Sequence, residues 1–214
     1  MNQNRDNLIA GLTEELSAVR VFRKRDGIAL LAVSALATLV GVELSEGLWR
    51  GILTGEPAPF FWVTSGLLLG LGLAASGVVI AMASPSVGQR HDAPRWASAM
   101  LGVLPLAALV SALSGPEGVT ALTLDDHASH CLQASLVASL ASGAALVLWL
   151  RRGAPVSLEK AGWLAGIAAG SLGTLAYGIS CTVDSVTHLG IWHVAPVALT
   201  AFVGRLVVPP LVRW

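Results

Sequence analysis

The chain has 214 residues, of which 54% are hydrophobic and 12% charged, and its 13 Lys and Arg balance its 13 Asp and Glu. A soluble domain carries about a quarter charged residues, so this composition leaves too little polar side chain to cover a surface that faces water. It excludes an ordinary soluble domain and indicates an integral membrane protein. Two cysteines are also too few for a disulfide scaffold or a four-thiolate zinc site.

The first 26 residues form a polar arm, which we expect to remain in the cytoplasm. The arm lacks an apolar run before a small-residue cleavage site, so no signal peptide is predicted. Between residues 7 and 22, apolar side chains recur at i, i+4, i+8 and i+11, which predicts a short amphipathic helix. The apolar stripe of this helix consists of Leu8, Leu12, Leu16 and Val19.

Three partners fit this stripe. It can lie on the inner leaflet or on its own bundle, aided by the basic cluster at residues 20–25, or it can dock into a groove on a cytoplasmic protein. Glu14 and Glu15 favour a basic protein partner, because anionic lipid would repel them.

Residues 27–214 contain six apolar stretches, each close to the roughly 20 residues that cross hydrocarbon as a helix. They are residues 27–48, 60–83, 96–113, 131–150, 161–180 and 189–208. Pro105 lies inside the third stretch, where a proline usually bends a membrane helix without ending it. The expected fold is an all-α membrane bundle of six transmembrane helices. Five or four spans are the alternatives, if the third or the first stretch lies only at the interface.

The positions of the charges predict the orientation. If the six spans alternate, 12 of the 13 Lys and Arg fall on one side and only Arg50 falls on the other. Since cytoplasmic loops carry the excess of Lys and Arg, both termini are predicted to be cytoplasmic. The opposite side collects acidic residues, namely Glu46, Glu56, Glu117, Asp125, Asp126 and Asp184.

Ionisable residues are nearly absent from the predicted spans. Glu43 lies near the outer end of the first span and Arg205 near the inner end of the last. Transporters place charged residues near the midplane, so a small-molecule or metal transporter is the weaker alternative. The sequence also lacks the C-x-x-C pair expected of a thiol-active membrane enzyme, and it carries no metalloprotease, P-loop or nucleophile-elbow motif. We therefore expect a protein that is not an enzyme.

The fifth span carries Gly162, Gly166 and Gly170 at intervals of four residues. Such a ridge lets helices approach closely, and we expect it to pack inside the bundle.

The two cysteines are predicted to lie at the same level of the outer face. Cys131 opens the fourth span and Cys181 ends the fifth, and each lies 20 or 21 residues from the cationic residues at the inner end. At 1.5 Å per residue both helices rise about 30 Å, which returns the two thiols to one height.

Three interpretations of this outer cluster remain open. The thiols can form a disulfide, which an oxidising compartment favours. Alternatively, two thiolates and one or two imidazoles make a soft metal site, with candidate ligands Cys131, Cys181, His127, His130, His188, His193 and Asp184. In the third interpretation the cysteines are small interfacial residues and the histidines ordinary loop residues.

Several motifs carry a resemblance to a known family. They are the arm LIAGLTEELSAVR, the segment Arg151-Arg152-Gly153-Ala154-Pro155 before the Gly/Ala-rich fifth span, Tyr177, Cys181, Asp184, Trp192-His193, Gly204-Arg205 and Arg213-Trp214. With these motifs the chain resembles the six-helix membrane anti-sigma factors of the negative regulator of sigma F (NrsF) family. The resemblance covers essentially the whole chain and is strongest from residue 130 onward.

The resemblance implies a regulator of transcription in the bacterial inner membrane. Its cytoplasmic arm would hold an extracytoplasmic-function sigma factor inactive, through Leu8, Leu12, Glu15, Leu16, Val19 and Arg20. Cys131 and Cys181 match the family's two cysteines, which serve in sensing heavy metals such as chromate and cadmium. We therefore expect release of the sigma factor when a heavy metal or an oxidant acts on these thiols. The implied partners are the sigma factor and the lipid bilayer, without direct contact to nucleic acid, and the only implied cofactor is a transient heavy-metal ion.

Overall fold

The computed structural model describes residues 3–14, 23–84, 95–115, 120 and 126–213. These residues form helices and no strand, which confirms the all-α prediction. The helices are α1 (Gln3–Glu14), α2 (Lys24–Ser45), α3 (Gly51–Thr54), α4 (Pro59–Met82), α5 (Arg95–Ser114), α7 (Ala128–Arg151), α8 (Leu158–Gly178), α9 (Val186–Trp192) and α10 (Ala195–Val212).

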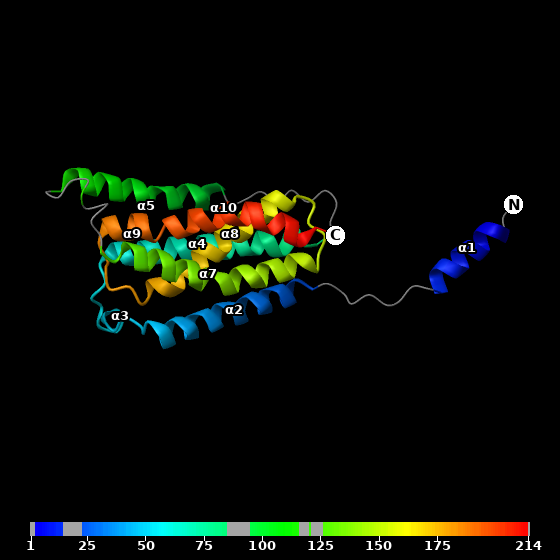
Figure 1. Ribbon diagram of the computed structural model, residues 1–214, viewed down its shortest axis with the longest axis horizontal. Helices are drawn as coiled ribbons and strands as arrows, with labels where there is room; N and C mark the ends of the chain where they lie inside the picture. Colours follow the sequence, from blue (N-terminus) through cyan, green and yellow to red (C-terminus); the bar gives the residue numbers. More distant parts are fainter. Residues whose placement is uncertain (1–2, 15–22, 85–94, 116–119, 121–125, 214) are drawn as a thin grey trace.

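The long helices run along one bundle (Figure 1). The start of α2 and the end of α10 lie at the same end of this bundle, whereas α3 and α9 lie at the other (Figure 1). In the part of the chain that the structure describes, four segments are long and apolar enough to cross a membrane: Lys24–Ser45, Pro59–Met82, Ala128–Arg151 and Val186–Val212. These correspond to the first, second, fourth and sixth predicted spans, while six spans and the orientation stay predictions.

Helix α5 covers the third predicted span. It continues through Pro105, as expected of a proline inside a membrane helix. Its apolar part, Gly102–Ser114, is shorter than the other candidates. Leu104, Ala108 and Ala112 are buried, and α5 packs against α9 and α4.

Helix α8 lies at the centre of the bundle. Of its 21 residues, 15 are buried, and it packs against α10, α7, α4 and α2. The predicted glycine ridge faces α10, where a Cβ on Gly166 would overlap the carbonyl oxygen of Thr200. The ridge therefore permits contact between two backbones, which confirms its expected role in packing within the bundle.

The outer surface of the bundle is apolar. Large side chains on α2, α4, α7 and α10 are exposed, among them Leu36, Leu44, Leu73, Val137, Leu140, Phe202 and Leu206. In water this many exposed apolar side chains would cause association, whereas in a bilayer they would face lipid tails. The surface thus agrees with the composition in pointing to a membrane protein.

Helix α1 lies apart from the bundle (Figure 1) and contacts none of the other described helices. It contains the first half of the predicted arm helix, and Leu8, Ile9 and Leu12 on it are 63%, 54% and 57% exposed. The other residues predicted to bind a sigma factor, namely Glu15, Leu16, Val19 and Arg20, lie outside the described residues.

Candidate functional site

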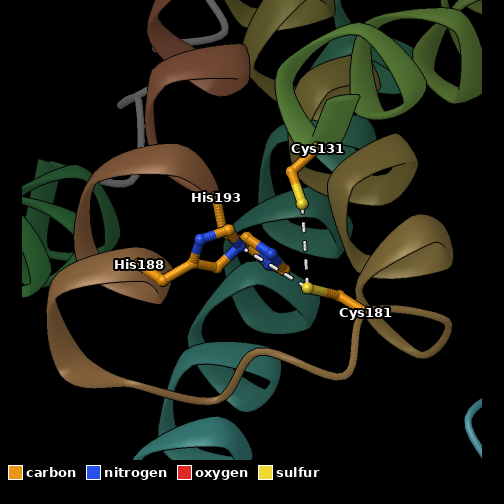
Figure 2. A group of neighbouring side chains, drawn as sticks. All are labelled: Cys131, Cys181, His188 and His193. Carbon is orange, nitrogen blue, oxygen red and sulfur yellow. Dashed lines mark hydrogen bonds between the residues drawn. The ribbon is translucent and has the colours of Figure 1, made fainter. Parts of the chain in front are cut away.

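Four side chains converge near the end of the bundle where α7 begins. They are Cys131, Cys181, His188 and His193, and their sulfur and nitrogen atoms lie within 4.8 Å of one another. Figure 2 shows them pointing toward a common centre from three separate segments. All four are buried, and none is more than 4% exposed. The structure thus joins the two predicted sensing residues to two of the predicted metal ligands.

Cys131 lies in the first turn of α7. The helix begins at Ala128, three residues earlier than the predicted span, and the backbone N–H of Cys131 donates to the carbonyl oxygen of His127 over 2.9 Å. The Cys131 side chain is buried within the bundle. Its Sγ lies 3.5 Å from the hydroxyl oxygen of Tyr177 and 3.7 Å from the Sγ of Cys181.

Cys181 does not end a helix as predicted, because α8 stops at Gly178 and the cysteine follows in a turn. In that turn the N–H of Cys181 donates to the carbonyl of Gly178 over 3.3 Å. The predicted common level of the two thiols is nevertheless confirmed by their 3.7 Å separation. The two sulfurs are not joined in a disulfide, which would need them about 2.05 Å apart.

The two histidines come from a break in the sixth predicted span. This span consists of α9 and α10, separated by a turn at His193 and Val194. The Ser185 hydroxyl caps α9 by accepting from the N–H of His188 over 3.2 Å, and Pro196 stands in the first turn of α10, where a proline suits a helix start. The break brings both imidazole rings to the same side, with ring centroids 5.4 Å apart.

The imidazoles differ in their hydrogen bonding. The Nε2 of His188 lies 3.5 Å from the Sγ of Cys181. The Nε2 of His193 is buried and has no hydrogen-bond partner among the described residues. An unpaired buried polar group costs about 1–3 kcal/mol, so this nitrogen marks a place where a water, an ion or another donor would stabilise the fold.

The other predicted ligands lie outside this four-residue cluster. His130 points to α2, where its Nε2 lies 3.1 Å from the carboxylate of Glu46. Asp184 accepts a hydrogen bond from the N–H of Ala58 over 2.7 Å, at the start of α4. His127 is exposed at the N-cap of α7.

Tyr177 was not predicted as part of the site, although its hydroxyl touches Cys131. It is buried near the end of α8, four residues before Cys181 in the sequence, and this closeness to a candidate cysteine is the sequence signal that could have found it.

Helix α2 also borders the site. Val42 packs into the same buried cluster as Cys131, Tyr177 and Cys181. At the other end of α2, Gly27 lies so close to Trp149 of α7 that a Cβ would come within 2.6 Å of the indole ring. The helix that directly follows the N-terminal arm therefore contacts α7 both beside the cysteines and at the opposite end of the bundle.

The sequence is similar to those of known regulators. The family model described as "Negative regulator of sigma F" (NrsF) matches residues 12–214. An anti-sigma-F factor NrsF of Caulobacter vibrioides is 29% identical over 188 residues, which cover 85% of this chain and 84% of that protein. A probable anti-sigma-F factor NrsF of Azospira oryzae is 24% identical over 156 residues, 73% of either chain. No solved structure matches this chain.

Proposed function

We propose that this chain, which belongs to the NrsF family of negative regulators of sigma F, holds an extracytoplasmic-function sigma factor inactive at the bacterial inner membrane. The family is regulatory and not enzymatic, in line with the expectation from the sequence. Relatives named as anti-sigma-F factors support a sigma factor as the partner. The membrane location is supported by the four apolar segments and by the apolar side chains exposed on the outside of the bundle.

The proposed contact with the sigma factor is the apolar face of α1. Leu8 and Leu12 are one helical turn apart and exposed, with Ile9 beside them. A lone helix of 12 residues is marginally stable in water, so it gains stability by laying this face into a groove. The proposed arm continues through Glu15, Leu16, Val19 and Arg20, and it requires the N-in, C-in topology because sigma factors act in the cytoplasm. The charge asymmetry of the sequence supports that topology.

The proposed signal is a chemical change at Cys131 and Cys181, either ligation of a soft metal or oxidation. The observation that carries this proposal is the contact between the thiol cluster and α2, the helix that follows the arm. Val42 packs beside the thiols, and Glu46 at the C-cap of α2 pairs with His130, which precedes Cys131. A change in the packing of the thiols therefore acts directly on α2.

The size of the required effect is modest. A ligand shifts the equilibrium between holding and releasing only through its difference in affinity for the two arrangements. A tenfold weakening of sigma factor binding requires about 1.4 kcal/mol of such coupling. Small changes in buried packing around the thiols supply energies of this size.

The arm is tested by binding between the full-length protein in lipid nanodiscs and a purified extracytoplasmic-function sigma factor from the same organism. We expect the double variant Leu8→Asp/Leu12→Asp to lose binding. The matched control is Ala10→Asp, which adds a carboxylate to the opposite face of the same helix and should bind normally. Equal loss in both variants would refute recognition through the apolar face. Absence of binding by the wild-type protein would refute the anti-sigma proposal itself.

The thiols are tested in cells with a reporter that depends on the sigma factor. Cys131→Ser and Cys181→Ser should each keep the sigma factor bound and abolish induction by cadmium. Normal induction in both variants would refute sensing at these cysteines. A metal transporter, the competing function, would instead move cadmium in vesicles and would not need the arm.

A further inference from the structure

We propose that Cys131, Cys181, His188 and His193 form one tetrahedral site for a divalent cation of the zinc and cadmium type. This inference deepens the proposed function and rests on it for the signal, since it names the class of ion that acts at the two cysteines. It also adds two imidazole ligands from the α9–α10 break to the thiol pair.

The distances between the donor atoms carry the proposal. Zinc binds thiolate sulfur at about 2.3 Å and imidazole nitrogen at about 2.0 Å, so a tetrahedral ion holds two sulfurs about 3.8 Å apart and a sulfur and a nitrogen about 3.5 Å apart. The two sulfurs here lie 3.7 Å apart, and Cys181 Sγ lies 3.5 Å from His188 Nε2. Both separations match edges of that tetrahedron.

The fourth ligand is the buried imidazole of His193. The ligand atoms of the four residues, that of His193 included, all lie within 4.8 Å of one another. This largest separation is about 1 Å longer than the ideal sulfur–sulfur edge of a zinc tetrahedron. The Nε2 of His193 lacks a hydrogen-bond partner among the described residues. Because His193 stands in the turn between α9 and α10, a small rotation of this turn brings the ring onto the ion.

The charge of the ligand set selects a divalent ion. When a divalent cation binds, both thiols lose a proton to solvent and both imidazoles bind in their neutral form. Two thiolates and one divalent cation sum to zero charge, which suits a site whose four residues are at most 4% exposed. Sulfur and imidazole nitrogen also favour zinc or cadmium over magnesium or calcium, which take oxygen ligands.

The surroundings of the thiolates fit this chemistry as well. The Tyr177 hydroxyl lies 3.5 Å from Cys131 Sγ and can donate a hydrogen bond to the thiolate. Groups that donate hydrogen bonds to metal ligands orient those ligands and tune the affinity of the site. A bound ion would therefore tie together the start of α7, the turn after α8 and the α9–α10 break, while Tyr177 steadies one of its sulfurs.

The site is tested on the full-length protein in nanodiscs, reduced and freed of metal. Zinc X-ray absorption of the wild-type protein should show two sulfurs at about 2.3 Å and two nitrogens at about 2.0 Å. Titration with Co²⁺ should give tetrahedral d–d bands and a thiolate charge-transfer band at one ion per chain. A sulfur shell without imidazole nitrogen would overturn the proposal, and this measurement does not depend on any variant folding.

Variants test each imidazole separately. His188→Gln and His193→Gln should each weaken zinc binding more than about 100-fold, beyond the roughly 10–100-fold loss typical when a group that only hydrogen-bonds to a ligand is changed. The matched control is His130→Gln, which removes an imidazole next to Cys131 but outside the cluster. Zinc binding by the two variants equal to that of the control would overturn the site.

The two proposals fail separately in these experiments. The histidine variants should still capture the sigma factor, because the arm is unchanged. If they capture it and bind zinc normally, the four-ligand site is wrong and the anti-sigma function stands. If the wild-type protein binds zinc through all four ligands and captures no sigma factor, the proposed function is wrong and the site stands.

Discussion

The contact between α8 and α10 predicts that one methyl group at Gly166 destabilises the bundle. A Cβ built there would lie 2.7 Å from the Cα of Ala201, which is 0.7 Å short of the 3.4 Å at which ordinary contact begins. The obstructing atoms belong to the backbone of α10, so no side chain can swing aside. Overpacking of this kind costs about 1–3 kcal/mol.

The control for this prediction is Gly70→Ala in α4, where a Cβ would meet no atom within 4 Å. Both variants gain the same helix propensity of about 0.5–1 kcal/mol from replacing glycine, so their difference isolates the packing cost. At roughly 2–4 °C per kcal/mol, Gly166→Ala should unfold about 2–12 °C below Gly70→Ala.

The unfolding is followed with a thiol-reactive fluorophore, because Cys131 and Cys181 are the only cysteines and both are buried until the bundle opens. Equal midpoints for the two variants, or a higher midpoint for Gly166→Ala, would refute the inference that the helices touch through their backbones.

Four further outcomes follow from the contacts and from the proposed zinc site. Trp149→Phe removes the indole N–H that donates to the buried carbonyl of Ile80 over 3.2 Å, and thermal unfolding should show a loss of about 1–3 kcal/mol. Glu46→Gln should change stability by less than about 1 kcal/mol, because the pair with His130 is largely exposed; a greater loss would show that the pair is energetically important. Zinc at 100 times its dissociation constant should stabilise the wild-type protein by about 2.7 kcal/mol. Tryptophan fluorescence should show this as a higher midpoint of thermal unfolding, whereas zinc should not change the midpoint of Cys131→Ser. Zinc affinity should fall by up to about 100-fold per unit decrease in pH below the thiol pKa values, because binding requires the loss of two protons, and a pH-independent affinity would exclude thiolate ligation.

Much of the fold could be predicted because lipid imposes strong constraints on a sequence. The lengths of the apolar stretches locate the long helices, and the distance from each cysteine to the cationic end of its span placed the two thiols at one level. The residues at which the helices end were less predictable. Cys181 lies in a turn beyond α8, because the last helical hydrogen bonds end at Gly178 and hydropathy does not distinguish a helix end from the turn after it.

The candidate site could be predicted only in part. His188 and His193 approach the thiols because the chain breaks between α9 and α10, and a continuous apolar stretch hides such a break. Asp184 and His130 looked equally suitable in the sequence. Each instead pairs with a residue far along the chain, the N–H of Ala58 or the carboxylate of Glu46, and sequence spacing carries no information about those pairs.

The central position of α8 has a consequence for biogenesis. Helix α8 is rich in Gly and Ala, and its surface packs against neighbouring helices. Its composition leaves it outside the segments that are apolar enough to cross a membrane. A nascent helix that enters lipid by itself must be apolar enough to partition there. We therefore expect that α8 by itself partitions poorly from the translocon into lipid. It should insert together with its neighbours, once α7 and then α10 are available to cover it. Truncation after α8 should accordingly leave this segment incompletely inserted, even though it is the most enclosed helix of the finished protein.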